Sequence, residues 1–94
     1  MTSKQRAYLK GLAQTTETIL NIGKATLTPE VVAACDEALE KRELIKVGVL
    51  KNCVADPMEM AQTIAERTNA EVVQVIGKKI VLFRPSKKHP KIKL

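Results

Sequence analysis

The sequence predicts an α/β domain in which a mixed four-stranded sheet is packed with helices, in the order helix, strand, helix, strand, helix, strand, strand. Two helix starts have proline directly after a capping residue, Thr28 and Asp56, and each lies between two runs rich in β-branched residues. The segment 71–84 holds two such runs separated by Gly77 and Lys78, which predicts a hairpin. Crossover helices favour parallel neighbouring strands, and the hairpin adds an antiparallel pair.

The first helix is predicted over residues 3–13, with Thr2 or Ser3 as its N-cap. Arg6 and Lys10 lie four residues apart and share one face, where they could offer two cations to a partner, although a solvated face explains them as well. The opposite stripe is apolar and should pack on the domain. It consists of Tyr8, Leu9 and Leu12.

The next two elements are a short buried strand over 18–22 and a helix from Thr28 and Pro29 to about Arg42. The threonine hydroxyl can accept from free N–H groups at the helix start, and proline is tolerated at the first helical position. Cys35 falls on the inner stripe of this helix. It is therefore expected to be a core residue and not a nucleophile.

The following strand is predicted over 44–50, with alternate residues on one buried face. A third helix begins at Asp56 and Pro57 and stops near Asn69. The two hairpin strands complete the domain, which is expected to span residues 1–85. The remaining residues, 86–94, form a basic tail with little core content, expected to be mobile or to become ordered on binding.

The net charge of +6 is unevenly distributed along the chain. Residues 1–29 carry four basic side chains and one acidic one, residues 30–74 carry five basic and nine acidic ones, and residues 75–94 carry seven basic and none acidic. If the fold brings the two ends together, they form a cationic surface suited to a polyanion.

Composition argues against several other classes of protein. The chain has 94 residues, which suits one domain without a large enclosed active site, and no acid, base and nucleophile are grouped, so an enzyme is not expected. Neither a cofactor nor a metal site is expected, because the two cysteines lie far apart and the only histidine is in the tail. No apolar run is long enough for a membrane span, and the cytoplasm is the expected compartment.

The turn 23-GKAT-26 is the candidate anion site. A turn between a strand end and a helix start gathers unpaired backbone N–H groups at the positive end of the helix dipole. Gly23 permits close approach of a phosphate to the backbone, and Lys24 adds a mobile charge. A plain chain reversal with a solvated lysine is the alternative. A nucleotide-binding P-loop is excluded because Ala25 follows the lysine where that motif has serine or threonine.

Four segments of the chain, in order and spacing, resemble the CRM domain, named for chloroplast RNA splicing and ribosome maturation, in its single-domain bacterial YhbY-like form. The resemblance spans nearly the whole chain. The segments are 2-TSKQRAYLKGLA-13, 22-IGKATLTPEVV-32, 43-ELIKV-47 and 74-QVIGKKIVLFRPS-86.

This resemblance implies a fold similar to the C-terminal domain of bacterial translation initiation factor 3, and association with precursors of the large ribosomal subunit. It also implies RNA contact through a Gly-x-x-Gly loop, which falls on Gly23, Lys24, Ala25 and Thr26. Thr26 stands where the family usually has its second glycine. If that position needs positive φ, the threonine is strained by about 1–3 kcal/mol, and its hydroxyl offers another donor to a phosphate.

The leading hypothesis is an RNA-binding ribosome assembly factor that acts as a monomer and recognises the shape and backbone of structured ribosomal RNA, since one tyrosine and one phenylalanine cannot stack on several bases. The alternative is a protein-interaction module that docks a ribosomal or translation protein through its acidic second helix or its basic tail, and DNA binding ranks third. The candidate RNA contacts are Arg6, Lys10, Gly23, Lys24, Ala25, Thr26, Lys78, Lys79 and Arg84.

Overall fold

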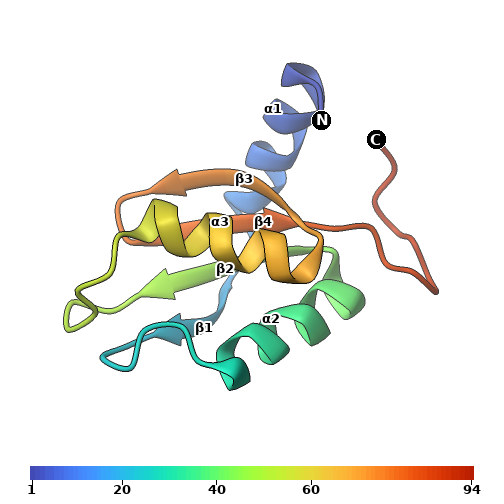
Figure 1. The fold of residues 1–94 in the computed structure, drawn as a ribbon. Helices are drawn as coiled ribbons and strands as arrows, with labels where there is room; N and C mark the ends of the chain where they lie inside the picture. The colour runs from blue at the N-terminus through green and yellow to red at the C-terminus, as the bar shows by residue number, and fades with distance from the viewer.

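A computed structural model describes all 94 residues and shows the predicted order of elements. Three helices and four strands follow one another along the chain (Figure 1). Each helix is capped by the side chain expected to start it, with Thr2 chosen over Ser3 for the first. The elements are α1 (Ser3–Ala13), β1 (Thr18–Ile22), α2 (Pro29–Arg42), β2 (Leu44–Val49), α3 (Pro57–Thr68), β3 (Glu71–Ile76) and β4 (Lys79–Phe83).

The strands form one mixed sheet in the order β1-β2-β4-β3. β1 and β2 are parallel, whereas β4 runs antiparallel to both β2 and β3. The second crossover therefore does not join neighbouring strands as expected, because β4 lies between β2 and β3. Four consecutive residues of β4, Ile80 to Phe83, are buried on both faces, which suits a central position, while β3 has exposed ends and suits an edge.

Helices cover both faces of the sheet, with α2 and α3 on one side and α1 on the other (Figure 1). The larger core packs α2 and α3 on residues such as Ile45, Val47 and Ile80. The smaller one packs Leu9 of α1 on Val81 and its neighbours. α1 contacts β2, β3 and β4. We call the surface on this side of the sheet next to the C-terminal end of α1, formed by residues of β2, β3 and β4, the open face.

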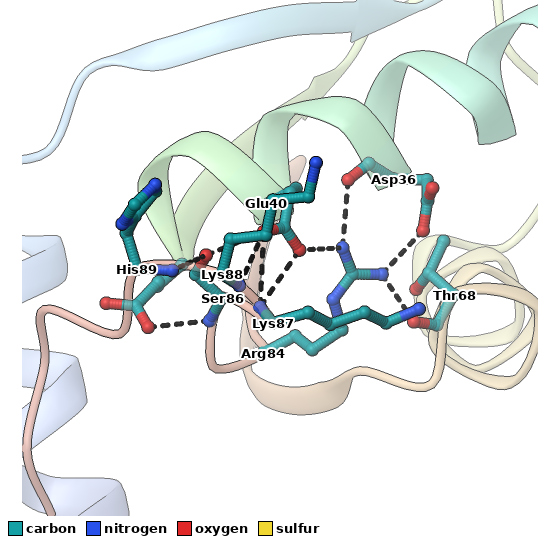
Figure 2. A network of polar contacts seen from close by, with 9 residues as sticks. Asp36, Glu40, Thr68, Arg84, Ser86, Lys87, Lys88 and His89 are labelled. Carbon is teal, nitrogen blue, oxygen red and sulfur yellow. Dashed lines mark hydrogen bonds and ion pairs between the residues drawn. The ribbon is translucent and has the colours of Figure 1, made fainter.

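The last residues are not a free arm: they follow the C-terminal end of α2 toward the start of α1 (Figures 1 and 2). Buried Glu43 accepts backbone N–H groups of Ser86, Lys91 and Ile92, each at 2.7 Å. Glu40 accepts the Ser86 hydroxyl at 2.7 Å and the Lys87 and Lys88 N–H groups at 3.1–3.3 Å. Two carboxylates, one in α2 and one at its C-terminal end, therefore hold the segment that the sequence predicted to be mobile or to become ordered on binding.

These contacts change the acidity of both carboxyl groups. The Ser86 hydroxyl and the Lys87 N–H lower the pKa of Glu40 to about 2, against burial, which acts the other way. Burial raises the pKa of Glu43, but the three N–H groups that its carboxylate accepts outweigh that effect and lower the pKa on balance. Both groups are therefore stabilised as carboxylates by folding.

We expect the stabilisation from Glu40 to depend on pH. Its pKa is lower in the folded chain, so its contribution is complete above its ordinary pKa of 4.5 and is lost as the pH falls toward about 2. The difference in unfolding free energy between the wild type and Glu40→Gln should accordingly shrink between pH 6 and pH 3. Thermal melts followed by circular dichroism measure it. A difference that stays constant over this range contradicts the assignment.

Candidate nucleic-acid interface

Three chain connections lie side by side at one edge of the sheet, which we call the loop edge (Figure 1). They are residues 23–28, 50–56 and 77–78. β1 and β2 are parallel and end together there, and the Leu50 N–H donates to the Ile22 carbonyl at 2.8 Å. The hairpin joins them because the Val49 N–H donates to the Lys78 carbonyl at 2.7 Å. Helices α2 and α3 both begin at this edge, so their positive dipole ends are directed toward it.

Residues 23–26 form a tight turn in which the Thr26 N–H donates to the Gly23 carbonyl at 3.0 Å. Thr26 has a φ of 57°, in the left-handed region. Thr26 occupies the position of the second glycine in the Gly-x-x-Gly motif. The backbone there keeps a conformation that favours glycine, although threonine is β-branched. Such a residue is strained there by about 1–3 kcal/mol. The fold stores this strain at the turn nearest the start of α2.

Gly23 has a different role, because its φ is not in the positive region. An added Cβ would meet Leu50 Cδ1 at 3.5 Å, an ordinary contact. The fold therefore does not need glycine at this position. What the missing side chain provides is access to the backbone of the turn from outside.

Each connection of the loop edge carries one lysine, and all three are exposed: Lys24, Lys51 and Lys78. None of them takes part in an ion pair within the protein. Sequence reasoning missed Lys51, which follows a strand as an ordinary loop lysine. Its signal was the parallel pairing of β1 and β2, which places the residues after both strands at the same edge.

A second group of lysines lies on the open face, where Lys10, Lys46 and Lys79 line a hollow of about 240 Å³. Two of these were expected as RNA contacts. Lys46 was not, although it alternates with the buried residues of β2 and so had to point to this side of the sheet. Lys79 directly follows Lys78, which makes the open face continuous with the loop edge.

Arg6 is half-buried and does not share a solvent-exposed face with Lys10 as expected. Its Nη1 donates to the carbonyl oxygens of Val72 and Val73. The register of β3 shifts between Val72 and Gln74, so the guanidinium bonds to the backbone of an irregular part of this edge strand. The Arg6 guanidinium is therefore bonded to the backbone of β3, away from the loop edge.

Arg84 is buried, with a side chain 7% exposed, at the opposite end of β4 from the loop edge (Figure 2). Its Nη1 donates to an Asp36 carboxylate oxygen and, at 2.7 Å, to the Thr68 carbonyl. Its Nη2 donates to the Asp36 carbonyl at 3.1 Å and lies 3.6 Å from a Glu40 oxygen. A guanidinium occupied in this way joins α2 to α3 and is not available to a phosphate. Arg84 therefore does not belong to the candidate interface.

The same network uses much of the acidic face of α2. Asp36, Glu40 and Glu43 hold Arg84 or the tail, and Glu37 pairs with Lys41 at 3.1 Å. Of the acidic residues that suggested protein docking through this helix, only Glu30 has no such partner. The structure thus gives most of these carboxylates an internal role.

Comparison with known proteins agrees with this fold. Residues 1–84 match the model of the CRS1/YhbY (CRM) domain. The chain is 37% identical to "Probable RNA-binding protein YqeI" of Bacillus subtilis over 94 residues, which is 98% of that protein, and 37% identical to an "RNA-binding protein" of Haemophilus influenzae over 86 residues, 87% of that protein and 92% of this chain. The solution structure of a Staphylococcus aureus protein, described as a candidate RNA-binding protein, is 45% identical, covers the whole of this chain and 98% of its own, and superposes with a TM-score of 0.83.

Replacing Thr26 with glycine should raise the free energy of unfolding by about 1 kcal/mol, because glycine adopts the left-handed conformation without strain. Chemical denaturation followed by circular dichroism measures the change. Ala25→Gly is the matched control, since Ala25 in the same turn has no positive φ. That control should lose stability through the greater freedom of the unfolded chain. Equal effects of the two changes would show that Thr26 carries no strain.

Replacing Arg84 with methionine should lower the free energy of unfolding by about 3 kcal/mol, because it leaves the Thr68 carbonyl and the Asp36 carboxylate without their donor and removes the cation beside Glu40. RNA affinity measured well below the melting temperature should not change. Lys24→Met is the control for removal of an exposed charge, with a change in stability within about 0.5 kcal/mol. An RNA affinity that falls in the folded Arg84→Met variant would return Arg84 to the interface.

Proposed function

The chain belongs to the CRS1/YhbY (CRM) domain family, and on that premise we propose that it binds structured ribosomal RNA in the cytoplasm and acts in assembly of the large ribosomal subunit. Residues 1–85 serve as the RNA-binding domain and 86–94 as its basic tail. Similarity to proteins named as RNA-binding supports the choice of partner. The proposed role in ribosome assembly rests on the family resemblance seen in the sequence.

The observation that carries the proposal is the loop edge itself. Three lysines from three separate connections meet there without carboxylate partners, beside two helix starts and an accessible turn backbone. Phosphates are favoured at such a site by charge and by free N–H groups. Nothing in this arrangement reads a particular base. We therefore propose recognition of the RNA backbone and shape, by a monomer and without a cofactor or a catalytic step.

We assign the phosphate contacts to the loop edge and the adjoining open face. The turn contributes its backbone at Gly23 and Ala25 and the hydroxyl of Thr26. The lysines that contribute charge are Lys10, Lys24, Lys46, Lys51, Lys78 and Lys79.

None of the helices combines the length and the apolar character needed to cross a bilayer. No group of three His, Cys, Asp or Glu side chains converges at a point where a metal ion could bind.

Neutralising the loop edge should weaken RNA binding and its dependence on salt. For Lys24→Gln, Lys51→Gln and Lys78→Gln combined, the slope of log affinity against log salt should fall by about three, one for each phosphate that a lysine no longer neutralises. Fluorescence anisotropy with transcripts of large-subunit ribosomal RNA measures both quantities. The matched control changes Lys41, Lys87 and Lys88 to glutamine at the far end of the sheet. Equal losses in the two triple variants refute the assignment to the loop edge.

The ribosomal part is tested by crosslinking the protein to RNA in cells and sequencing the attached fragments. Enrichment in precursors of the large-subunit RNA is expected. Tags spread evenly over cellular RNAs would contradict a role in ribosome assembly while leaving RNA binding itself intact.

A further inference from the structure

The hollow on the open face has features that phosphate binding alone does not explain. It lies between the C-terminal end of α1 and the surface of β2, β3 and β4, and it directly adjoins the loop edge through Lys79. Charged, amide and apolar side chains all line it. A ligand that fits the hollow should therefore use the three kinds together.

The charge in the hollow is not balanced by the protein. Lys10, Lys46 and Lys79 converge on it, no carboxylate lines it, and none of the three takes part in an ion pair. Like charges held near one another repel, and a bound anion relieves that repulsion. The hollow therefore favours a ligand with at least one negative charge.

A glycine in β2 makes room for one of the lysines that line the hollow. Lys79 reaches across Gly48 and donates to Thr18 Oγ1 at 3.2 Å. A Cβ added to Gly48 would lie 3.3 Å from Lys79 Nζ and only 2.2 Å from Asn21 Oδ1. The bare backbone at this position thus lets the Lys79 side chain lie across the sheet and hold its ammonium group in place.

The remaining lining suits a flat, partly polar ligand. Gln14 and Gln74 bring two amides, each of which can donate and accept hydrogen bonds. Val81 and Ile76 add apolar surface, and Ile76 is 61% exposed, so its side chain is open to a ligand. Amides can hydrogen-bond to the donor and acceptor edges of an unstacked base, and the apolar surface and the cations beside them suit its flat face and its phosphates.

We propose that this hollow binds one unpaired nucleotide of an RNA whose neighbouring backbone lies along the loop edge. The base lies against Ile76 and Val81 and bonds to the amides of Gln14 and Gln74, while the flanking phosphates meet Lys10, Lys46 and Lys79. The proposal rests on the proposed RNA-binding function and adds a preference to it. A fully paired duplex cannot place a base in the hollow, whereas a duplex with a bulged nucleotide can.

The test compares two RNA hairpins that differ only by one bulged nucleotide, using fluorescence anisotropy at one fixed salt concentration. Wild-type protein should bind the bulged hairpin about tenfold more tightly, the effect of one or two hydrogen bonds between the base and the glutamine amides. The double variant Gln14→Ala and Gln74→Ala should lose this preference and keep its affinity for the paired hairpin. Gln62→Ala, which removes an exposed amide from α3, is the control and should keep the preference.

Nuclear magnetic resonance gives a second readout that does not depend on the folding of any variant. The side-chain amide signals of Gln14 and Gln74 should shift on addition of the bulged hairpin more than on addition of the paired one. Equal affinity of wild type for both hairpins, a preference that survives in the double variant, or unshifted amide signals would each overturn the nucleotide site. Loss of binding in the loop-edge triple variant, seen alongside any of these, would leave the phosphate site standing. A wild-type protein that binds neither hairpin refutes both.

Discussion

The position of the C-terminal segment depends on the hydrogen bonds that the Glu43 carboxylate accepts. This carboxylate lies buried where α2 ends and β2 begins, at a residue with a positive φ of 66°, and three backbone N–H groups of the last residues point at it. Its own carbonyl accepts the Arg84 N–H as β4 ends. A single residue, through its side chain and its backbone carbonyl, thus links one helix, two strands and the C-terminal segment. Once the tail is fixed there, Ile92 can pack on the core beneath α1.

The same contact explains how a protein with many acidic residues presents basic surfaces. The carboxylates at the C-terminal end of α2 are satisfied mainly by Arg84 and by backbone N–H groups, not by lysines. The lysines of the loop edge and the open face consequently keep their full charge for a partner. The charge that a partner meets at the surface therefore depends on which charged groups are bonded within the protein. The net charge of the chain alone does not reveal it.

Local signals predicted the elements well. Capping residues and proline placed each helix start, alternation placed the strands, and Gly77 marked the hairpin with its φ of 55°. The insertion of β4 between β2 and β3 was not predicted, because the strand order depends on the burial of both faces of β4 and not on any local sequence pattern. The burial of Arg84 was not predictable either. Its partners lie 16 and 48 residues away in sequence, and an arginine after a strand resembles any surface cation. Lys46 and Lys51 could be assigned to the candidate interface only from the strand pairing. It places Lys46 on the open face and Lys51 at the loop edge.

The course of the tail also determines where the two termini lie. Both are on the same side of the molecule, close enough that Thr2, Lys4, Lys93 and Leu94 line one shallow depression (Figure 1). The loop edge lies at the other end of the strands. A dye, a solid support or a fused protein attached at either terminus would therefore stand clear of the surface assigned to RNA. A short linker could likewise join the two ends into a closed chain, as is often possible for domains whose termini are close together.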